Sequence, residues 1–194
     1  MKSHILEKLA ELEQTRKDFW NIPHESANFI NMLIKTKNMK NILEIGTSNG
    51  YSAIWICDAL SITKGHLVSL EFWQKRIDLA EENLKYCGLF DYITIKLGSA
   101  LESIKKLSPK DFQEPETNKL ALDMVFIDAN KKEYIKYFEL VHPLIKKNGI
   151  ILADNVTSHK ESTSAYVEAI SQHPDYQTQL LPFDGGLLMS VKVV

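Results

Sequence analysis

The chain alternates from residue 41 onward between short apolar runs and longer amphipathic stretches, and this alternation restricts its fold more than any other feature. Five apolar runs are predicted to be strands, at residues 41–45, 66–71, 92–98, 120–128 and 149–154. The stretches predicted to be helices follow them, at residues 51–60, 74–87, 100–107, 131–145 and 161–172. Such alternation predicts an α/β fold in which helices cover both faces of a parallel sheet. Because crossovers between parallel strands are right-handed, a doubly wound sheet is the expected topology.

The C-terminal part of the chain departs from this alternation. Residues 176–183 and 186–194 are two apolar runs with Asp184 and Gly185 between them. Such a pair predicts an antiparallel β-hairpin, which brings the mostly parallel sheet to seven strands. Residues 108–119 are polar and contain two prolines, so a loop is expected there.

The N-terminal part reads as two helices, over residues 3–20 and 24–36. The first has one apolar face, which needs a partner surface either on its own domain or on a second subunit. We expect one domain over residues 1–194, with the helices of residues 1–36 as an appendage. A homodimer is the expected assembly.

Composition and charge exclude several classes of protein. The net charge of −2 gives no reason to expect bulk binding of nucleic acid or of an anionic membrane. No apolar run approaches the roughly 20 residues that a membrane helix needs, and the N-terminus lacks the apolar segment of a signal peptide. Cys57 and Cys87 have no metal-binding spacing, and neither predicts a disulfide framework. These features predict a cytoplasmic protein.

Acidic residues lie at the ends of four predicted strands. Glu44 stands beside the exit of the first strand, and Glu71, Asp128 and Asp154 close three others. In open α/β sheets, ligands bind beyond the carboxyl ends of the strands. Any one of these acids alone is more simply a helix cap or a solvated loop residue. Four carboxylates at one edge repel one another unless cations or hydroxyl donors lie among them, and so they predict a ligand site.

The first two strands favour a nucleoside ligand. Gly46 and Gly50 flank the loop after the first strand and permit close approach to the backbone, while Glu71 suits the hydroxyls of a ribose. The loop lacks the second glycine of the dinucleotide fingerprint and the lysine of the Walker sequence. Glu44 would repel a pyrophosphate and attract an ammonium group. S-adenosylmethionine therefore fits these residues better than NAD, and an NAD-type oxidoreductase is the weaker alternative.

The fourth and fifth strands favour a divalent cation. Asp128 closes one of them, and Asp154 with Asn155 closes the other. Two carboxylates and an amide oxygen are hard ligands of the kind that Mg²⁺ takes, although an Asp-Asn pair alone is more often a turn. Lys131 follows Asp128 by three residues and is the candidate general base; the plainer alternative is a solvated helix face.

Five segments in order, LEIGTSNGYSAIW, VSLEFW, LGSALE, VFIDANKKEYIKYFE and ILADNV, resemble the cation-dependent O-methyltransferases. That family includes catechol, caffeoyl-CoA and bacterial small-molecule enzymes, and a bacterial branch that methylates a hydroxylated uridine of tRNA is similar as well. The resemblance runs from about residue 22 to the C-terminus. It implies a Rossmann-like methyltransferase fold whose last strand pair is antiparallel.

The resemblance also implies a role for each matching residue. Those that bind S-adenosylmethionine would be Glu44, Gly46, Ser48, Gly50 and Ser52 at the methionine end and ribose side, Glu71 at the ribose hydroxyls, Phe72, Ser99 and Ala100 at the adenine, and Asp128. The metal ligands would be Asp128, Asp154 and Asn155, with Lys131 as the catalytic lysine.

These observations lead to one expected function and two alternatives. We expect an S-adenosylmethionine-dependent, divalent-cation-assisted O-methyltransferase that acts on a small molecule with two neighbouring oxygens. The alternatives are a tRNA 5-hydroxyuridine O-methyltransferase and a non-catalytic nucleotide-binding module. Members of the family usually carry a longer insertion after the Asp-Asn pair, so the acceptor site here is expected to be more open or covered by a partner subunit. Trp55 and Trp73 are predicted to be packing residues.

Overall fold

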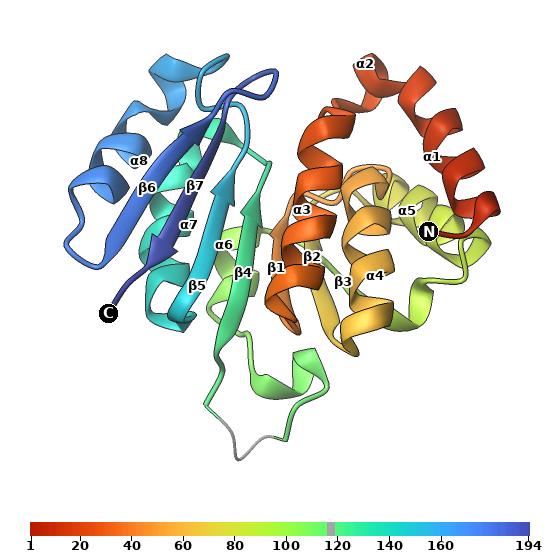
Figure 1. Ribbon diagram of the computed structural model, residues 1–194, viewed down its shortest axis with the longest axis horizontal. Coiled ribbons are helices and arrows are strands. Elements are labelled where there is room, and N and C mark those ends of the chain that lie inside the picture. Colours follow the sequence, from red (N-terminus) through yellow and green to blue (C-terminus); the bar gives the residue numbers. More distant parts are fainter. Residues whose placement is uncertain (116–118) are drawn as a thin grey trace.

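A seven-stranded sheet forms the centre of the computed structural model, which describes residues 1–115 and 119–194 (Figure 1). Its strands are β1 Asn41–Ile45, β2 His66–Glu71, β3 Ile93–Leu97, β4 Leu122–Ile127, β5 Ile145–Ala153, β6 Tyr176–Leu181 and β7 Leu187–Lys192. Their order in the sheet is β3-β2-β1-β4-β5-β7-β6. The first five are parallel, whereas β7 runs antiparallel to both β5 and β6. The predicted parallel sheet and its C-terminal hairpin are therefore confirmed.

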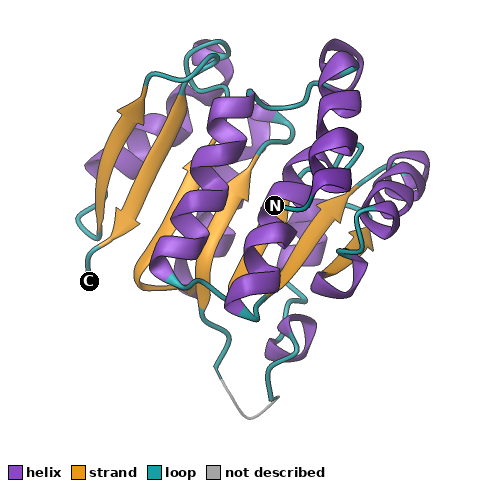
Figure 2. Cartoon of the chain, turned by 45° about the vertical axis from the view of Figure 1, so that its right-hand side comes forward, coloured by secondary structure: helices purple, strands orange, loops and turns teal. Residues whose placement is uncertain are grey.

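Helices lie on both faces of this sheet (Figure 2). The α-helices are α1 Ser3–Gln14, α2 Arg16–Phe19, α3 His24–Lys37, α4 Tyr51–Thr63, α5 Gln74–Tyr86, α6 Ala100–Ile104, α7 Tyr134–Val141 and α8 Lys160–Gln172. Short 3-10 helices are η1 Phe90–Tyr92, η2 Pro109–Phe112, η3 Lys131–Glu133 and η4 His142–Leu144. Among the residues that the structure describes, none of the helices combines the length and the apolar content that a membrane span requires.

Two hydrophobic clusters fill the space between the helices and the sheet. Successive strand residues point to opposite faces, so Ile42 of β1 joins one cluster and Leu43 joins the other. The first cluster contains buried residues of α1, α3 and α4, and the second contains those of α6, α7 and α8. Ile5 and Leu9 of α1 are each only 2% exposed, so this helix packs on its own domain. Residues 1–36 thus share a core with the sheet.

The N-terminal helix is interrupted where the sequence predicted one helix over residues 3–20. The first helix ends at Gln14, and a separate turn, α2, runs from Arg16 to Phe19. Trp20 then takes a left-handed conformation, with φ of 56°, and stops the turn. The backbone can therefore change direction before Pro23 and enter α3.

The other corrections concern the segments around the fourth and fifth strands. β5 begins at Ile145 rather than at residue 149, because Ile145 pairs with Leu122 before a register shift in the ladder. The helix predicted from residue 131 is a 3-10 turn followed by α7, which ends at Val141. Part of the predicted loop at 108–119 forms η2, capped by Ser108, whereas residues 116–118 lie outside the described residues.

Candidate functional site

The site lies where the direction of strand order reverses, between β1 and β4. The chain proceeds outward from β1 to β2 and β3, and then returns to β4 on the other side of β1. Loops that leave neighbouring strands in opposite directions open a crevice at such a point. Gly46 leaves β1 with φ of 104°, and a Cβ atom there would overlap the backbone carbonyl of Asp128. This glycine therefore lets the two loops approach each other.

A cavity of about 1580 Å³ extends from this crevice across the carboxyl ends of the strands. Typical pockets for one small ligand measure roughly 300–1,000 Å³, so this one has room for two molecules side by side. Among the predicted site residues, those that line it are Gly46, Ser48, Ser52, Glu71, Phe72, Ser99, Ala100, Asp128, Lys131, Asp154 and Asn155. Glu44 and Gly50 do not line it.

Glu44 lies beneath the cavity floor rather than on its surface. The residue is fully buried, and its two carboxylate oxygens accept hydrogen bonds from Ser52 Oγ at 2.6 Å and Ser69 Oγ at 2.5 Å. Burial raises the pKa of Glu44 to about 7, and the nearby carboxylates of Asp128 and Glu71 act in the same direction. Ser52 does line the cavity, so it connects Glu44 to any ligand there.

The raised pKa of Glu44 makes the stability of the fold depend on pH. Folded Glu44 keeps its proton up to about pH 7, whereas the unfolded side chain loses it near 4.5, so the contribution is complete below 4.5 and lost as pH rises through 7. We expect Glu44→Gln to flatten the fall of Tm between about pH 4.5 and 7. Thermal denaturation at several pH values measures this, with exposed Glu82→Gln as the control. Equal slopes in Glu44→Gln and wild type would contradict the assignment.

Gly50 supports the site through packing. It caps α4 with φ of 84°, and a Cβ atom there would lie 3.1 Å from the Ala80 side chain of α5. A larger residue would push α4 and α5 apart. Its role in this structure is therefore to bring those two helices together.

Glu71 organises the loops at the end of β2. One carboxylate oxygen accepts a hydrogen bond from the backbone N–H of Ser48 at 2.9 Å. The other accepts from the backbone N–H groups of Phe72 at 2.8 Å and Trp73 at 3.0 Å. Each carboxylate oxygen has two lone-pair directions, so acceptor capacity remains for a ligand hydroxyl. The carboxylate therefore fixes the loop after β1 and still borders the cavity.

Two aromatic side chains project from the loop after β2. Phe72 is 66% exposed and Trp73 is 65% exposed, and both line the cavity. The prediction that Trp73 is a packing residue is therefore wrong, whereas Trp55 is buried, as expected of a packing residue. Trp73 lies at the residue before α5 begins, which carries it away from the sheet. Large exposed apolar rings beside a cavity favour a flat ligand such as a purine.

The carboxylates of Asp128 and Asp154 lie together at the ends of β4 and β5. Lys131 Nζ donates to Asp128 Oδ1 at 2.6 Å. Asp154 is 1% exposed, and its Oδ1 has no hydrogen-bond partner among the described residues. Burial raises the pKa of Asp154 to about 7, and the charge of Asp128 adds to the shift, while Lys131 opposes it. Tyr134 donates its hydroxyl to the carbonyls of Ile127 and Asp154, at 3.1 Å each, and so holds the two strand ends in register.

Asn155 turns out of β5 in a left-handed conformation, with φ of 62°. Its side chain lies against the hairpin loop, where a Cβ atom on Gly185 would come within 2.8 Å of Asn155 Nδ2. The backbone N–H of Thr157 donates to the Gly185 carbonyl at 3.0 Å. The β6–β7 hairpin therefore positions Asn155 beside Asp154.

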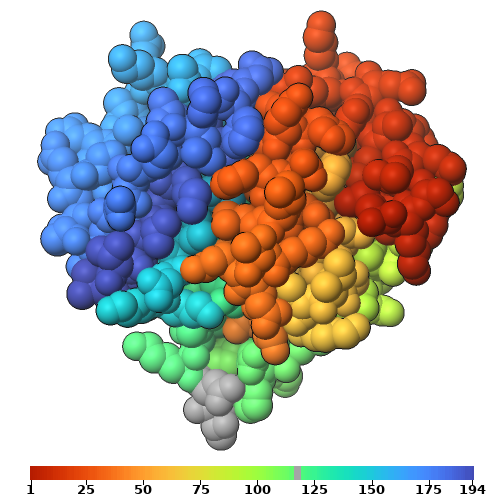
Figure 3. Space-filling model, in the orientation of Figure 1, coloured from red at the N-terminus to blue at the C-terminus, as the bar shows by residue number. Residues whose placement is uncertain are grey.

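The N-terminal segment forms a wall of the cavity that sequence reasoning missed. Arg16 Nη2 donates to Asp184 Oδ2 of the hairpin loop at 2.8 Å, and Ser48 Oγ donates to the carbonyl of Phe19 at 2.9 Å. Trp20, 75% exposed, lies with its ring centroid 5.3 Å from the guanidinium of Arg76. Figure 3 shows the N-terminal helices and the C-terminal hairpin side by side on one surface of the molecule.

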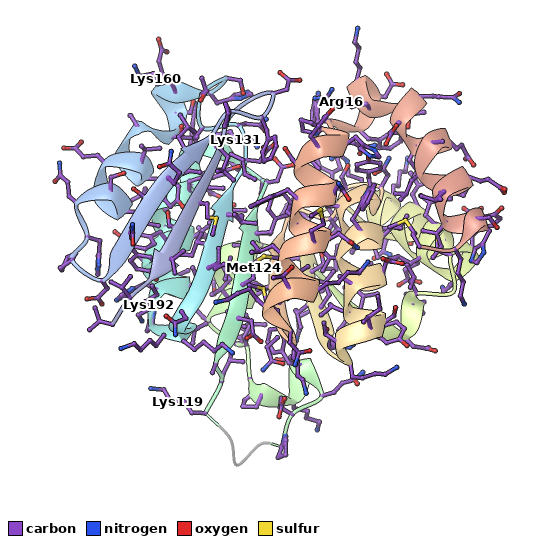
Figure 4. The ribbon with its side chains drawn as sticks, in the orientation of Figure 1. Arg16, Lys119, Met124, Lys131, Lys160 and Lys192 are labelled. Carbon is purple, nitrogen blue, oxygen red and sulfur yellow. The ribbon has the colours of Figure 1, made fainter. Side chains whose placement is uncertain are left out.

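No sequence pattern marks this wall, because the contacts join segments far apart in the chain. The Arg16–Asp184 pair spans 168 residues, and neither residue stands at a strand end. Figure 4 shows Arg16 and Lys131 at the same end of the molecule, and both line the cavity. His159 also lines the cavity.

The fold and this edge of the sheet define a ligand-binding α/β domain whose site combines a nucleoside-sized cleft with an acidic pocket. A family model described as O-methyltransferase matches residues 1–182. The chain belongs to the O-methyltransferase family.

Characterised relatives and solved structures agree with this family. A catechol O-methyltransferase of Niastella koreensis is 34% identical over 136 residues, which cover 70% of this chain and 58% of that protein. A caffeoyl-CoA O-methyltransferase of Eucalyptus globulus is 32% identical over 153 residues, which cover 77% and 60%. The chain thus matches less than two thirds of the length of these relatives.

Two solved structures extend the similarity to nearly the whole chain. The crystal structure of an O-methyltransferase from Bacillus cereus in complex with SAH has a TM-score of 0.82 and 25% identity, covering 99% of this chain and 92% of that one. A structure of a protein from Staphylococcus aureus described as a caffeoyl-CoA O-methyltransferase has a TM-score of 0.80 and 29% identity, covering 98% and 93%.

Proposed function

We propose that this protein transfers a methyl group from S-adenosylmethionine to a hydroxyl of a small molecule with two neighbouring oxygens, assisted by a divalent cation. The observation that carries the proposal is the acid pair Asp128 and Asp154 beside a cleft with room for two ligands. The similarity to the Bacillus cereus enzyme, whose structure contains SAH, supports the choice of methyl donor.

The residues at the ends of β4 and β5 fit a divalent cation. Asp154 Oδ1 is buried and has no hydrogen-bond partner among the described residues. Burying an unpaired carboxylate oxygen costs free energy, and a bound cation would offset that cost. Asp128, Asp154 and Asn155 offer oxygen ligands of the kind that Mg²⁺ prefers. A bound divalent cation would hold two neighbouring acceptor oxygens and favour ionisation of one hydroxyl.

The residues beyond β1 and β2 fit S-adenosylmethionine. Glu71 would accept hydrogen bonds from the ribose hydroxyls, and the exposed ring of Phe72 would lie against the adenine, near Ser99 and Ala100. Ser52, hydrogen-bonded to buried Glu44, would border the methionine end with Gly46.

Lys131 supplies the group that would accept the acceptor's proton. Its Nζ lies beside Asp128 and 5.3 Å from the centroid of the Tyr134 ring, so it is held at the edge of the acid pair. The acceptor oxygen would then attack the methyl carbon, the carbon–sulfur bond would break, and the neutral thioether would leave. Binding both reactants in one cleft in reacting orientation contributes to the rate.

One observation favours RNA as a second class of acceptor. Arg16, Lys17 and Arg76 line the cavity together with the exposed rings of Trp20 and Trp73. Cationic and aromatic side chains of this kind hold splayed-out bases, and the edge of 5-hydroxyuracil offers two adjacent oxygens as a catechol does. We place the small molecule first because the net charge is −2.

A methyl-transfer assay with labelled S-adenosylmethionine tests the proposal. We expect transfer to a catechol with Mg²⁺ present and loss of transfer after chelation, with little transfer to hypomodified tRNA. Transfer to tRNA alone would show that the acceptor is RNA and not a small molecule. Donor binding without transfer to either acceptor would favour the non-catalytic module.

The homodimer and the cytoplasmic location stay predictions. Size-exclusion chromatography with light scattering measures the first of them.

Glu71→Gln tests the ribose assignment. The substitution keeps the shape of the side chain but removes the charge that strengthens hydrogen bonds from ribose hydroxyls, so we expect affinity for S-adenosylmethionine to fall roughly 10- to 100-fold. Isothermal titration calorimetry measures the affinity. Glu81→Gln, which alters a surface ion pair with Lys85, is the matched control and should bind as wild type. Unchanged affinity in Glu71→Gln would show that Glu71 does not bind the ribose hydroxyls.

A further inference from the structure

A second group of metal-ligating side chains lies at the opposite end of the sheet from the candidate active site. It contains His142, His173 and Asp175, whose potential ligand atoms all lie within 4.8 Å of one another. His142 lies between α7 and β5, and the other two lie between α8 and β6. Figure 4 shows Lys192, a neighbour of this group, at the lower end of the sheet and Lys131 at the upper end.

The His142 ring is oriented with one nitrogen toward the carboxylate. Its Nδ1 lies 3.2 Å from the Tyr176 hydroxyl, while its Nε2 lies 3.9 Å from Asp175 Oδ2. When Nδ1 carries the ring proton and donates it to the Tyr176 hydroxyl, the lone pair of Nε2 is directed toward His173 and Asp175.

His173 and Asp175 are held by the turn that precedes β6. The backbone N–H of Asp175 donates to His173 Nδ1 at 3.2 Å, and Val193 N–H donates to the Asp175 carbonyl. A metal ion bound by His173 would replace this hydrogen bond, because a neutral imidazole has only one nitrogen with a free lone pair. The Asp175 carboxylate is half-buried and faces His142. Lys192 Nζ donates hydrogen bonds to the backbone carbonyls of His142 and Ile145 at 3.1 Å each, so these carbonyls hold its ammonium group.

Ring packing alone would also bring these histidines together. Phe138, His142, His173 and Tyr176 form mutual aromatic contacts, with the two histidine centroids 4.6 Å apart. Packing explains the rings but gives no reason for a carboxylate beside them. Two imidazoles with one carboxylate are the donor set that divalent transition metals select, with open positions left for water.

We propose that His142, His173 and Asp175 form a binding site for a divalent transition-metal ion of the Zn²⁺ type, separate from the candidate active site. One ligand follows α7 and two precede β6, so the ion would fasten the start of β5 to the start of the C-terminal hairpin. Nitrogen ligands distinguish this site from the all-oxygen set at Asp128, Asp154 and Asn155, because Mg²⁺ binds oxygen ligands almost exclusively. The role is structural and does not rest on the proposed function.

Calorimetric titration of the metal-free protein with ZnCl₂ tests the site in an Asp154→Asn background, which removes a carboxylate from the candidate active site. We expect one Zn²⁺ ion per chain, and a rise in Tm of about 5 °C at a hundredfold excess over Kd. Mg²⁺ should produce neither effect. Co²⁺ should give visible absorption bands typical of bound imidazole nitrogen.

Variants separate binding from packing. His173→Phe keeps an aromatic ring in the cluster and Asp175→Asn keeps the side-chain shape, and each should weaken Zn²⁺ binding at least tenfold. His24→Ala, a histidine elsewhere that contacts Glu13, should bind as the parent does. Titrations without stoichiometric binding, or with equal affinity in His173→Phe, Asp175→Asn and the parent, would overturn the proposal and leave the group as a packing cluster.

Discussion

Asp154→Ala is expected to abolish cation-dependent methyl transfer while S-adenosylmethionine still binds. The substitution removes a buried carboxylate that faces Asp128 and would ligate the cation. Loss of electrostatic stabilisation worth several kcal/mol corresponds to a rate reduction on the order of 10³-fold. Donor binding depends on residues beyond β1 and β2, so calorimetry should give an affinity close to that of wild type.

Replacing Asp154 should increase the stability of the metal-free protein, although it removes activity. Asp154 keeps its proton up to about pH 7 in the fold, so its contribution to stability is present at low pH and lost as pH rises through 7. In metal-free protein near pH 8, Asp154→Asn should therefore have a higher Tm than wild type. Exposed Asp91→Ala is the control for both measurements. Loss of donor binding together with activity, or full activity in Asp154→Ala, would refute the assigned role.

Lys131→Met should reduce kcat by roughly 10²- to 10⁴-fold, the range in which a positioned general base contributes. Methionine retains the length of the side chain but cannot accept a proton, and it leaves Asp128 without the ion pair at 2.6 Å. Steady-state kinetics with a catechol acceptor measure kcat, and titration measures donor affinity, which should change little.

The neighbouring lysine provides the control for this substitution. Lys132 is exposed and does not line the cavity, so Lys132→Met should retain full activity. A normal kcat in Lys131→Met would eliminate the lysine from the reaction.

The sheet was predictable because its determinants are local. Each parallel strand is a short apolar run, and the residue after it lies at the same edge as those of its neighbours. Glu71, Asp128 and Asp154 therefore fall at one edge whatever the details of packing, and all three line the cavity. The hairpin was predictable for the same reason, since its turn glycines lie between two apolar runs.

Other features depend on contacts that no local pattern encodes. Glu44 was expected to face a ligand, but strand alternation and the hydroxyls of Ser52 and Ser69 hold it below the floor. Trp73 was expected to be a packing residue, yet the turn into α5 leaves it exposed. The wall around Arg16 requires α1 to end at Gln14, and only the folded hairpin supplies its partner Asp184.

The bridge between Arg16 and Asp184 has a consequence for how the molecule is assembled during synthesis. Both residues border the cavity, yet 168 positions separate them along the chain. Without Asp184, Arg16 loses its ion-pair partner and the cavity loses the hairpin loop from its lining. A small molecule that contacts both walls would therefore bind only after the hairpin has packed beside the N-terminal helices.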